Sequence, residues 1–152
     1  MHAGDLAAPY PTVRVDADGL TAARLLTEHN RPGLIVVDEN DHPVAVLPGS
    51  QVLRMMIPSY VQDDPTLARV LDEESADKLY EVLADKTVRD LIPKDRVPLP
   101  VVAADDTVLE IAAIMAANRC PLVAVIGEAS DTAPLLGAIS ASDLLKKVLP
   151  PA

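Results

Sequence analysis

The feature that most constrains the fold is an internal repeat. Residues 18–39, DGLTAARLLTEHNRPGLIVVDE, align without a gap with residues 106–127, DTVLEIAAIMAANRCPLVAVIG. The offset is 106 − 18 = 88 residues, and it pairs apolar positions with each other, for example Leu26 with Ile114. Self-similarity at a fixed spacing indicates that one structural unit is used twice. The chain is therefore expected to fold as two copies of the same unit.

Each copy shows the same order of secondary-structure signals. A short β-prone segment is followed by an Asp that we expect to cap a helix, because Asp is a preferred N-cap residue. Apolar residues three and four apart predict the helix, which ends near Asn-Arg and a Pro. A continuous apolar run then predicts a strand buried on both faces, and a second strand and a last helix follow. These segments are 13–15, the helix from Asp18, 34–37, 44–47 and 50–56 in the first copy, and 101–102, the helix from Asp106, 122–126, 135–139 and 142–148 in the second.

The order β-α-β-β-α, written twice, predicts an α/β (α+β) fold. We place the first repeat at 1–58 and the second at 87–152 of the 152 residues. Residues 59–86 form a predicted helical insert with two helical patterns, at 65–71 and 75–84. Short lead-ins, GDLAAP and TVRDLIP, precede the two repeated cores.

The composition excludes several classes of function. The 23 acidic and 13 basic residues give a formal charge of −10, without the basic footprint that duplex DNA or an anionic membrane needs. The chain lacks Phe and Trp, on which single-stranded nucleic acids usually stack. No apolar run approaches the roughly 20 residues of a membrane span, and no signal core is present, so we expect a cytoplasmic protein. The one cysteine, Cys120, lies in an apolar run and is expected to be a buried thiol.

Three stretches carry a family resemblance: TVRDLIP, DDTVLEIAAIMAANRCPLVAV and GAISASDLL. In this order and in duplicate, the sequence resembles a tandem pair of cystathionine β-synthase (CBS) domains, called a Bateman module. The resemblance implies that the two repeats pack with pseudo-two-fold symmetry and leave two clefts between them. It also implies a flat homodimer of modules, an adenosine-containing ligand (AMP, ADP, ATP or S-adenosylmethionine), and regulation of a separate transporter, channel or enzyme.

Residues 137–143, GAISASD, are similar to the family's nucleotide-site pattern of Gly, two apolar residues, Ser or Thr, and an Asp three residues later. Asp143 would hold the ligand, because a carboxylate can accept two hydrogen bonds from a ribose 2′,3′-diol. The hydroxyls of Ser140 and Ser142 can donate to phosphate oxygens. The N-terminus of the helix that follows adds backbone N–H groups and a positive dipole end, which suit an anion.

The resemblance assigns further residues to the same ligand. Arg119 matches a position that often reaches a phosphate, and Arg31 is its expected counterpart in the first repeat. The apolar slot for the adenine would be lined by Pro100, Val101, Val102 and Ile139.

Other interpretations of these residues stay open. The sequence S-x-x-D at 140–143 is also a capping-box-like start, which would stabilise the last helix without any ligand. Arg119 is equally well read as a surface arginine.

The first repeat departs from the pattern. After Leu47, Pro48 stands in place of the Ser or Thr and Gln51 in place of the Asp. Proline offers neither a hydroxyl nor an N–H group, and Gln is a neutral acceptor. Leu47 and Arg31 are therefore weaker candidates, and we expect one ligand per chain.

These observations predict a non-enzymatic regulatory module that senses an adenosyl ligand for a separate target protein. The alternative is a dimerisation or interaction module with degenerate, ligand-free sites, which Pro48 and Gln51 favour. No required cofactor is expected, and His2, His29 and His42 lack the spacing of metal ligands.

Overall fold

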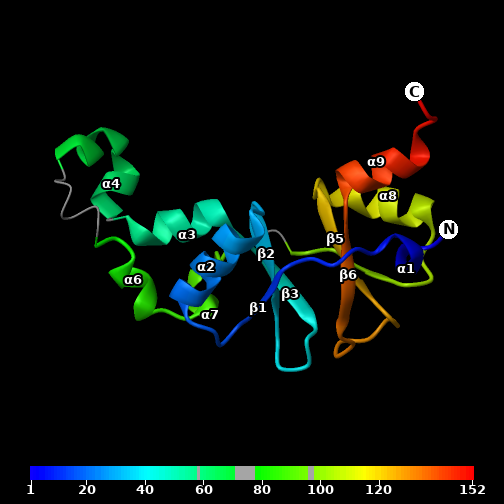
Figure 1. The fold of residues 1–152 in the computed structure, drawn as a ribbon, viewed down its shortest axis with the longest axis horizontal. Helices are drawn as coiled ribbons and strands as arrows, with labels where there is room; N and C mark the ends of the chain where they lie inside the picture. The colour runs from blue at the N-terminus through cyan, green and yellow to red at the C-terminus, as the bar shows by residue number, and fades with distance from the viewer. Residues whose placement is uncertain (58, 71–77, 96–97) are drawn as a thin grey trace. The chain divides into compact units, whose positions relative to one another are not determined.

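In the computed structural model, which describes residues 1–57, 59–70, 78–95 and 98–152, the strands form two three-stranded sheets (Figure 1). The first sheet has the order β1-β2-β3, with β1 at Thr12–Arg14, β2 at Gly33–Val37 and β3 at Pro43–Pro48. In the second sheet β4 is parallel to β5, and β5 is antiparallel to β6. These strands are Val101–Ala103, Leu122–Ile126 and Leu135–Ser140. The predicted fold class is confirmed.

Each repeat contributes two helices next to its strands. They are α2 at Gly19–His29 and α3 at Gly49–Met56 in the first repeat, and α8 at Val108–Asn118 and α9 at Ala141–Val148 in the second. The lead-ins form the one-turn helices α1 at Ala3–Leu6 and α7 at Val88–Leu91. None of the helices in the described ranges is long and apolar enough to cross a membrane.

The segment between the repeats differs in detail from its prediction. It contains α4 at Ser59–Asp63, which the sequence patterns did not predict, and α6 at Glu81–Ala84. Where a helix was expected at 65–71, residues Pro65–Val70 form the 3₁₀ helix η1. Leu71 and residues 75–77 of the second predicted helix lie outside the described residues.

The central strand of each sheet is buried along its whole length. Every residue of β2 and of β5 is buried, as the continuous apolar runs predict. On β5, Val123 and Val125 pack in one cluster with Ile111 and Met115 of α8 and with Leu144 of α9. These contacts fix α8 and α9 beside the second sheet.

The structure corrects the register of the internal repeat by one residue. The equivalent helices α2 and α8 are offset by 108 − 19 = 89, and the central strands by 122 − 33 = 89, rather than by 88. The predicted N-cap at Asp106 is therefore wrong. Thr107 caps α8 by accepting from the backbone N–H of Glu110 at 3.3 Å, while Asp106 accepts from Ala103 N at 2.9 Å.

The lead-in helices are exchanged between the two repeats. The chain divides into two compact units: unit 1 comprises Met1–Tyr10, Val37–Ala45 and Val97–Ala152, and unit 2 comprises Pro11–Val36 and Val46–Arg96. The N-terminal helix α1 thus belongs with the second repeat, where Ala3 is fully buried in the same cluster as Val102 and Ile139. Helix α7, which precedes the second repeat, buries Val88 and Leu91 in unit 2.

Backbone hydrogen bonds hold the N-terminal segment, residues 1–10, along the second sheet. Ala3 N donates to Asp106 O and Gly4 N to Ala104 O, both at 2.9 Å. Ala8 and Ala138 then bond to each other in both directions, at 3.0 and 2.9 Å. The backbone of Ala8 lies so close to Gly137 that a Cβ there would be 2.7 Å from the Ala8 carbonyl oxygen.

This close approach generates a prediction for Gly137→Ala. The added methyl group forces the N-terminal segment away from β6, so we expect a loss of about 1–3 kcal/mol in the free energy of unfolding. Chemical denaturation measures it. Gly127→Ala is the matched control, because its Cβ would meet only Leu136 Cδ1 at 3.9 Å. Equal stability of the two variants would contradict the predicted clash.

Two carboxyl groups at helix starts in unit 2, those of Asp18 and Asp90, have lowered pKa values. Hydrogen bonds from Thr21, chiefly from its backbone N–H at 2.7 Å, hold the pKa of Asp18 below its ordinary value of 3.8. The pKa of Asp90 is also lowered, first by the backbone N–H of Thr87 at 3.0 Å. A carboxyl group with a lower pKa in the folded state stabilises fully above its unfolded pKa, and this contribution is lost as the pH falls through the folded pKa.

We therefore predict that the melting temperature decreases as the pH falls below about 4, and that Asp18→Asn makes this decrease shallower. Asn also serves as an N-cap, so the variant removes the titration and keeps the cap. Thermal melts between about pH 2.5 and 6 measure the effect. Asp105→Asn, an exposed acid in the turn before α8, serves as the control. If the melting temperature of Asp18→Asn depends on pH as steeply as that of the native chain, Asp18 does not contribute to the pH dependence as predicted.

Candidate functional site

The strand-to-helix junction after Ile139 is built as a capped helix start. Ser140 ends β6 and is the N-cap of α9, and its Oγ accepts from the backbone N–H of Asp143 at 3.2 Å. The Oγ atoms of Ser140 and Ser142 are also 3.2 Å apart. The capping role proposed for Ser140 is therefore present. The hydrogen bond between the two serines uses one of their two hydroxyl protons and leaves the other available for a further partner.

The third residue (N3) of α9 is an acid, as in three other helices, but its side chain has different partners. In α1, α7 and α8 the side chains of Asp5, Asp90 and Glu110 accept from the backbone N–H of the N-cap residue, at 3.0, 3.0 and 2.8 Å. In α9 the N3 acid is Asp143. Its carboxylate lies 3.9 Å from Lys146 Nζ and lines a cleft. The half-exposed Asp143 side chain, with 53% of its surface accessible, is thus open to a ligand.

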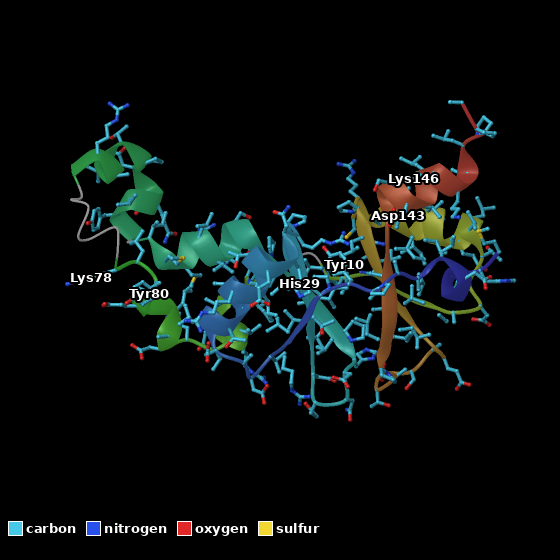
Figure 2. The ribbon with its side chains drawn as sticks, in the orientation of Figure 1. Tyr10, His29, Lys78, Tyr80, Asp143 and Lys146 are labelled. Atoms are coloured by element: carbon cyan, nitrogen blue, oxygen red, sulfur yellow. The ribbon has the colours of Figure 1, made fainter. Side chains whose placement is uncertain are left out.

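The cleft beside Asp143 is large enough for a small ligand. Its volume is about 410 Å³, within the range of roughly 300–1,000 Å³ typical of ligand pockets. The N-terminal segment forms one side of it, and β6 and α9 form the other. Figure 2 shows Asp143 and Lys146 together on α9. The lining residues are Asp5, Leu6, Ala8, Ile139, Asp143, Leu144, Lys146 and Lys147.

Of the residues predicted for the ligand, Ile139 and Asp143 are brought together in this cleft. Ser140 and Ser142 lie in the same turn as Asp143 but are not among the described residues that line it. Val101 and Val102 line a separate hollow of unit 1, of about 670 Å³. Pro100 is buried, and its carbonyl accepts from Ala124 N at 3.0 Å. Contact of these residues with an adenine stays a prediction.

Arg119 lies away from the Asp143 cleft. It is the C-cap of α8, with a left-handed backbone (φ 50°), and it lines a hollow between α8 and α9. The corrected register matches it with Asn30, the left-handed C-cap of α2 (φ 49°). The expected pairing of Arg119 with Arg31 is therefore wrong, because Arg31 follows the equivalent cap by one residue.

Sequence reasoning missed the two lysines and the N-terminal side of the cleft. A signal for Lys146 and Lys147 was present, since residues three and four positions after Asp143 share its side of a helix. No local sequence signal indicated that Asp5, Leu6 and Ala8 line the cleft. Their place there depends on the exchange of the lead-in helices, which only the tertiary structure reveals.

At the equivalent position of unit 2, a side-chain hydrogen bond joins α3 to α7. Gln51 matches Asp143 at the offset of α3 and α9, and Leu91 matches Leu6 at the offset of α7 and α1. Gln51 Nε2 donates to the Leu91 carbonyl oxygen at 3.1 Å. An ionised carboxylate has no proton to donate, so Asp143 cannot make this bond to Leu6. Leu47 and its match Ile139 are both almost fully buried, at 0% and 1% exposed.

A second, apolar hollow lies between α8 and α9. Its volume is about 610 Å³, and apart from Arg119 its lining is apolar or sulfur-bearing: Ala112, Met115, Ala116, Cys120, Pro121, Ala141, Leu144, Leu145 and Val148. Leu145 and Val148 are 53% and 52% exposed. On α3, Leu53 occupies the position equivalent to Leu145 and is 64% exposed. Large exposed apolar side chains at matched positions are typical of an interaction surface.

Comparison with known proteins identifies the repeated unit. The CBS domain profile matches residues 3–57 and 87–150. Among curated proteins, no sequence matches the chain.

Several solved structures are similar along the whole chain. A CBS-domain-containing protein of unknown function from Kribbella flavida is 53% identical, with 99% of both chains covered and a TM-score of 0.89. The CBS domain of a membrane protein from Sphaerobacter thermophilus is 28% identical, with 98% of this chain and 88% of that chain covered and a TM-score of 0.72. CBSX2, solved in complex with AMP, shares the fold at 18% identity, with 96% and 94% covered and a TM-score of 0.64.

Proposed function

Because the chain belongs to the CBS-domain family and carries that domain twice, we propose that it is a non-enzymatic regulatory module that binds one adenosine-containing ligand beside Asp143. The observation that carries the proposal is the open cleft of unit 1, in which a half-exposed carboxylate lies at a helix start. The AMP complex of CBSX2 supports this class of ligand. The bond from Gln51 to Leu91 supports a single site per chain.

The chemistry of the cleft suits a nucleoside. The Asp143 carboxylate accepts hydrogen bonds from the two ribose hydroxyls, and ionised acceptors form stronger hydrogen bonds than neutral ones. Leu6, which is partly exposed, is the large apolar residue with surface to offer the base, and the buried Ile139 and Leu144 also belong to the lining. The free proton of Ser140 or Ser142 is available to the sugar or a phosphate.

Regulation requires that the ligand favour one state of the protein over another, because equal affinity for two states shifts nothing. Leu6 and Ala8 line the cleft, and only a few residues later the chain enters β1 of unit 2. The N-terminal segment is therefore the part of the chain through which we propose that a bound ligand affects a separate target, such as a transporter or an enzyme.

The proposal predicts ligand-dependent thermal stability. At 100 times its Kd, a single-site ligand stabilises the fold by about 2.7 kcal/mol, which corresponds to a rise of roughly 5–10 °C in melting temperature for a chain of this size. We expect this rise with at least one of AMP, ADP, ATP and S-adenosylmethionine. Asp143→Ala should abolish it, whereas the matched variant Gln51→Ala should retain it.

The absence of any shift with all four compounds would refute ligand binding as proposed. A shift that survives Asp143→Ala but disappears in Gln51→Ala would move the site to unit 2. Circular dichroism of both variants without ligand verifies that each is folded.

The hollow between α8 and α9 favours a second role, homodimerisation of the module. A second copy of this chain is the proposed occupant, because the hollow is apolar and exposed Leu145 and Val148 border it. Such side chains gain stability when a partner covers them, at about 25 cal/mol for each Å² of apolar surface buried. This role does not depend on a nucleotide.

We predict that the chain is a dimer by light scattering after size-exclusion chromatography and that Leu145→Lys makes it monomeric. A charged ammonium group on the helix surface opposes burial in an apolar interface. Leu136→Lys is the control, because Leu136 is similarly exposed, at 55%, but lies on β6. A native monomer, or a Leu145→Lys dimer, would rule out this interface.

A further inference from the structure

The cleft holds two cations on the same helix as its carboxylate. Lys146 and Lys147 follow Asp143 by three and four residues, so all three side chains share one side of α9. All three line the cleft. Lysine side chains are long and flexible, and both Lys146 and Lys147 are exposed.

Two acids and two lysines line the cleft, so their charges sum to zero, and Lys147 is the lysine without an ion pair among the described residues. Lys146 Nζ lies 3.9 Å from Asp143 Oδ1 and balances that carboxylate. The other acid of the cleft, Asp5, is engaged at the start of α1, where Oδ2 accepts from His2 N at 3.0 Å and lies 4.0 Å from His2 Nδ1. Lys147 adds a second positive charge to the cleft.

The matched positions of unit 2 lack this arrangement. Arg54 is equivalent to Lys146, and its Nε donates to Gln62 Oε1 at 3.2 Å, toward the segment between the repeats. Met55, which is uncharged, is equivalent to Lys147. The pair of cations therefore occurs in the repeat that also has the Asp, and not where Gln51 replaces it. The difference in these cations between the repeats is one charge, that of Lys147, and it stands four residues after the Asp that the first repeat lacks.

Resting on the proposed nucleoside site, we infer that Lys146 and Lys147 make the cleft selective for ligands that carry a phosphate group. A ribose held by Asp143 places its 5′ substituent within a few Å, which is within reach of a lysine on the next turn. Ammonium groups form charge-assisted hydrogen bonds with phosphate oxygens. Uncharged adenosine gains nothing from them, and S-adenosylmethionine has a cationic sulfonium at the 5′ position, where AMP has its phosphate, with its carboxylate further from the ribose.

Calorimetric titrations of the full chain with AMP, adenosine and S-adenosylmethionine test this inference. We expect AMP to bind about tenfold more tightly than adenosine, and S-adenosylmethionine to bind most weakly. In K146Q/K147Q the affinity for AMP should fall about three- to tenfold, toward that for adenosine. R54Q, which removes one charge from the matched position in unit 2, should keep the native preference. Added salt should weaken AMP binding more than adenosine binding.

The outcomes separate this inference from the proposed function. Equal affinities for AMP and adenosine in the native chain would overturn the selectivity but leave the nucleoside site in place. An equal loss of both affinities in K146Q/K147Q would also overturn it, since the lysines would then act on the fold or the sugar. If none of the three compounds binds, the proposed function and the selectivity fail together.

Discussion

The exchange of the two lead-in helices is the constraint on which the rest of the structure depends. Each lead-in is bonded through its backbone to the turn that follows the first strand of the other repeat, in the same pattern. The bonds are Ala3 N to Asp106 O and Gly4 N to Ala104 O in unit 1, and Val88 N to Ala17 O and Arg89 N to Val15 O in unit 2. Because Ala3 and Val88 are fully buried, the core of each repeat is complete only with the lead-in that precedes the other repeat in the sequence. The same exchange brings the N-terminal segment to the cleft.

A few substitutions distinguish the two repeats at the matched positions of this pattern. Ala8 pairs with the backbone of Ala138, whereas its match, Pro93, has no N–H group to donate. Gly137 admits the N-terminal segment, and its match in β3 is Ala45, whose Cβ occupies that space. These differences decide how closely a lead-in can approach the last strand. The replacement of the Asp by Gln51 also decides whether the side chain can donate a hydrogen bond. Both repeats can therefore keep the same fold while the second has an Asp, and the first a Gln, at the start of the last helix.

The sequence was sufficient for the repeated strands and helices, but not for α4 and η1 or for the long-range partners of the elements. Continuous apolar runs located β2 and β5, because burial on both faces leaves no polar alternation. The repeat register was wrong by one residue, since apolar spacing of three and four tolerates that shift and both Asp106 and Thr107 are acceptable N-caps. Arg119 was assigned to the ligand from a motif, but its place depends on the left-handed turn that ends α8. No local pattern could indicate that residues 1–10 complete the second repeat.

The start of α9 shows how one motif can serve both folding and binding. A capping box uses two side chains, the N-cap hydroxyl and the N3 acid, and at α8 Thr107 and Glu110 fill both roles. At α9 the Ser140 hydroxyl caps the helix, while the Asp143 carboxylate lines the cleft. The N-cap hydrogen bond contributes about 1 kcal/mol, and it holds the backbone of Asp143 in place. The capping and ligand interpretations of S-x-x-D are therefore compatible, because the serine fixes the position from which the aspartate can bind.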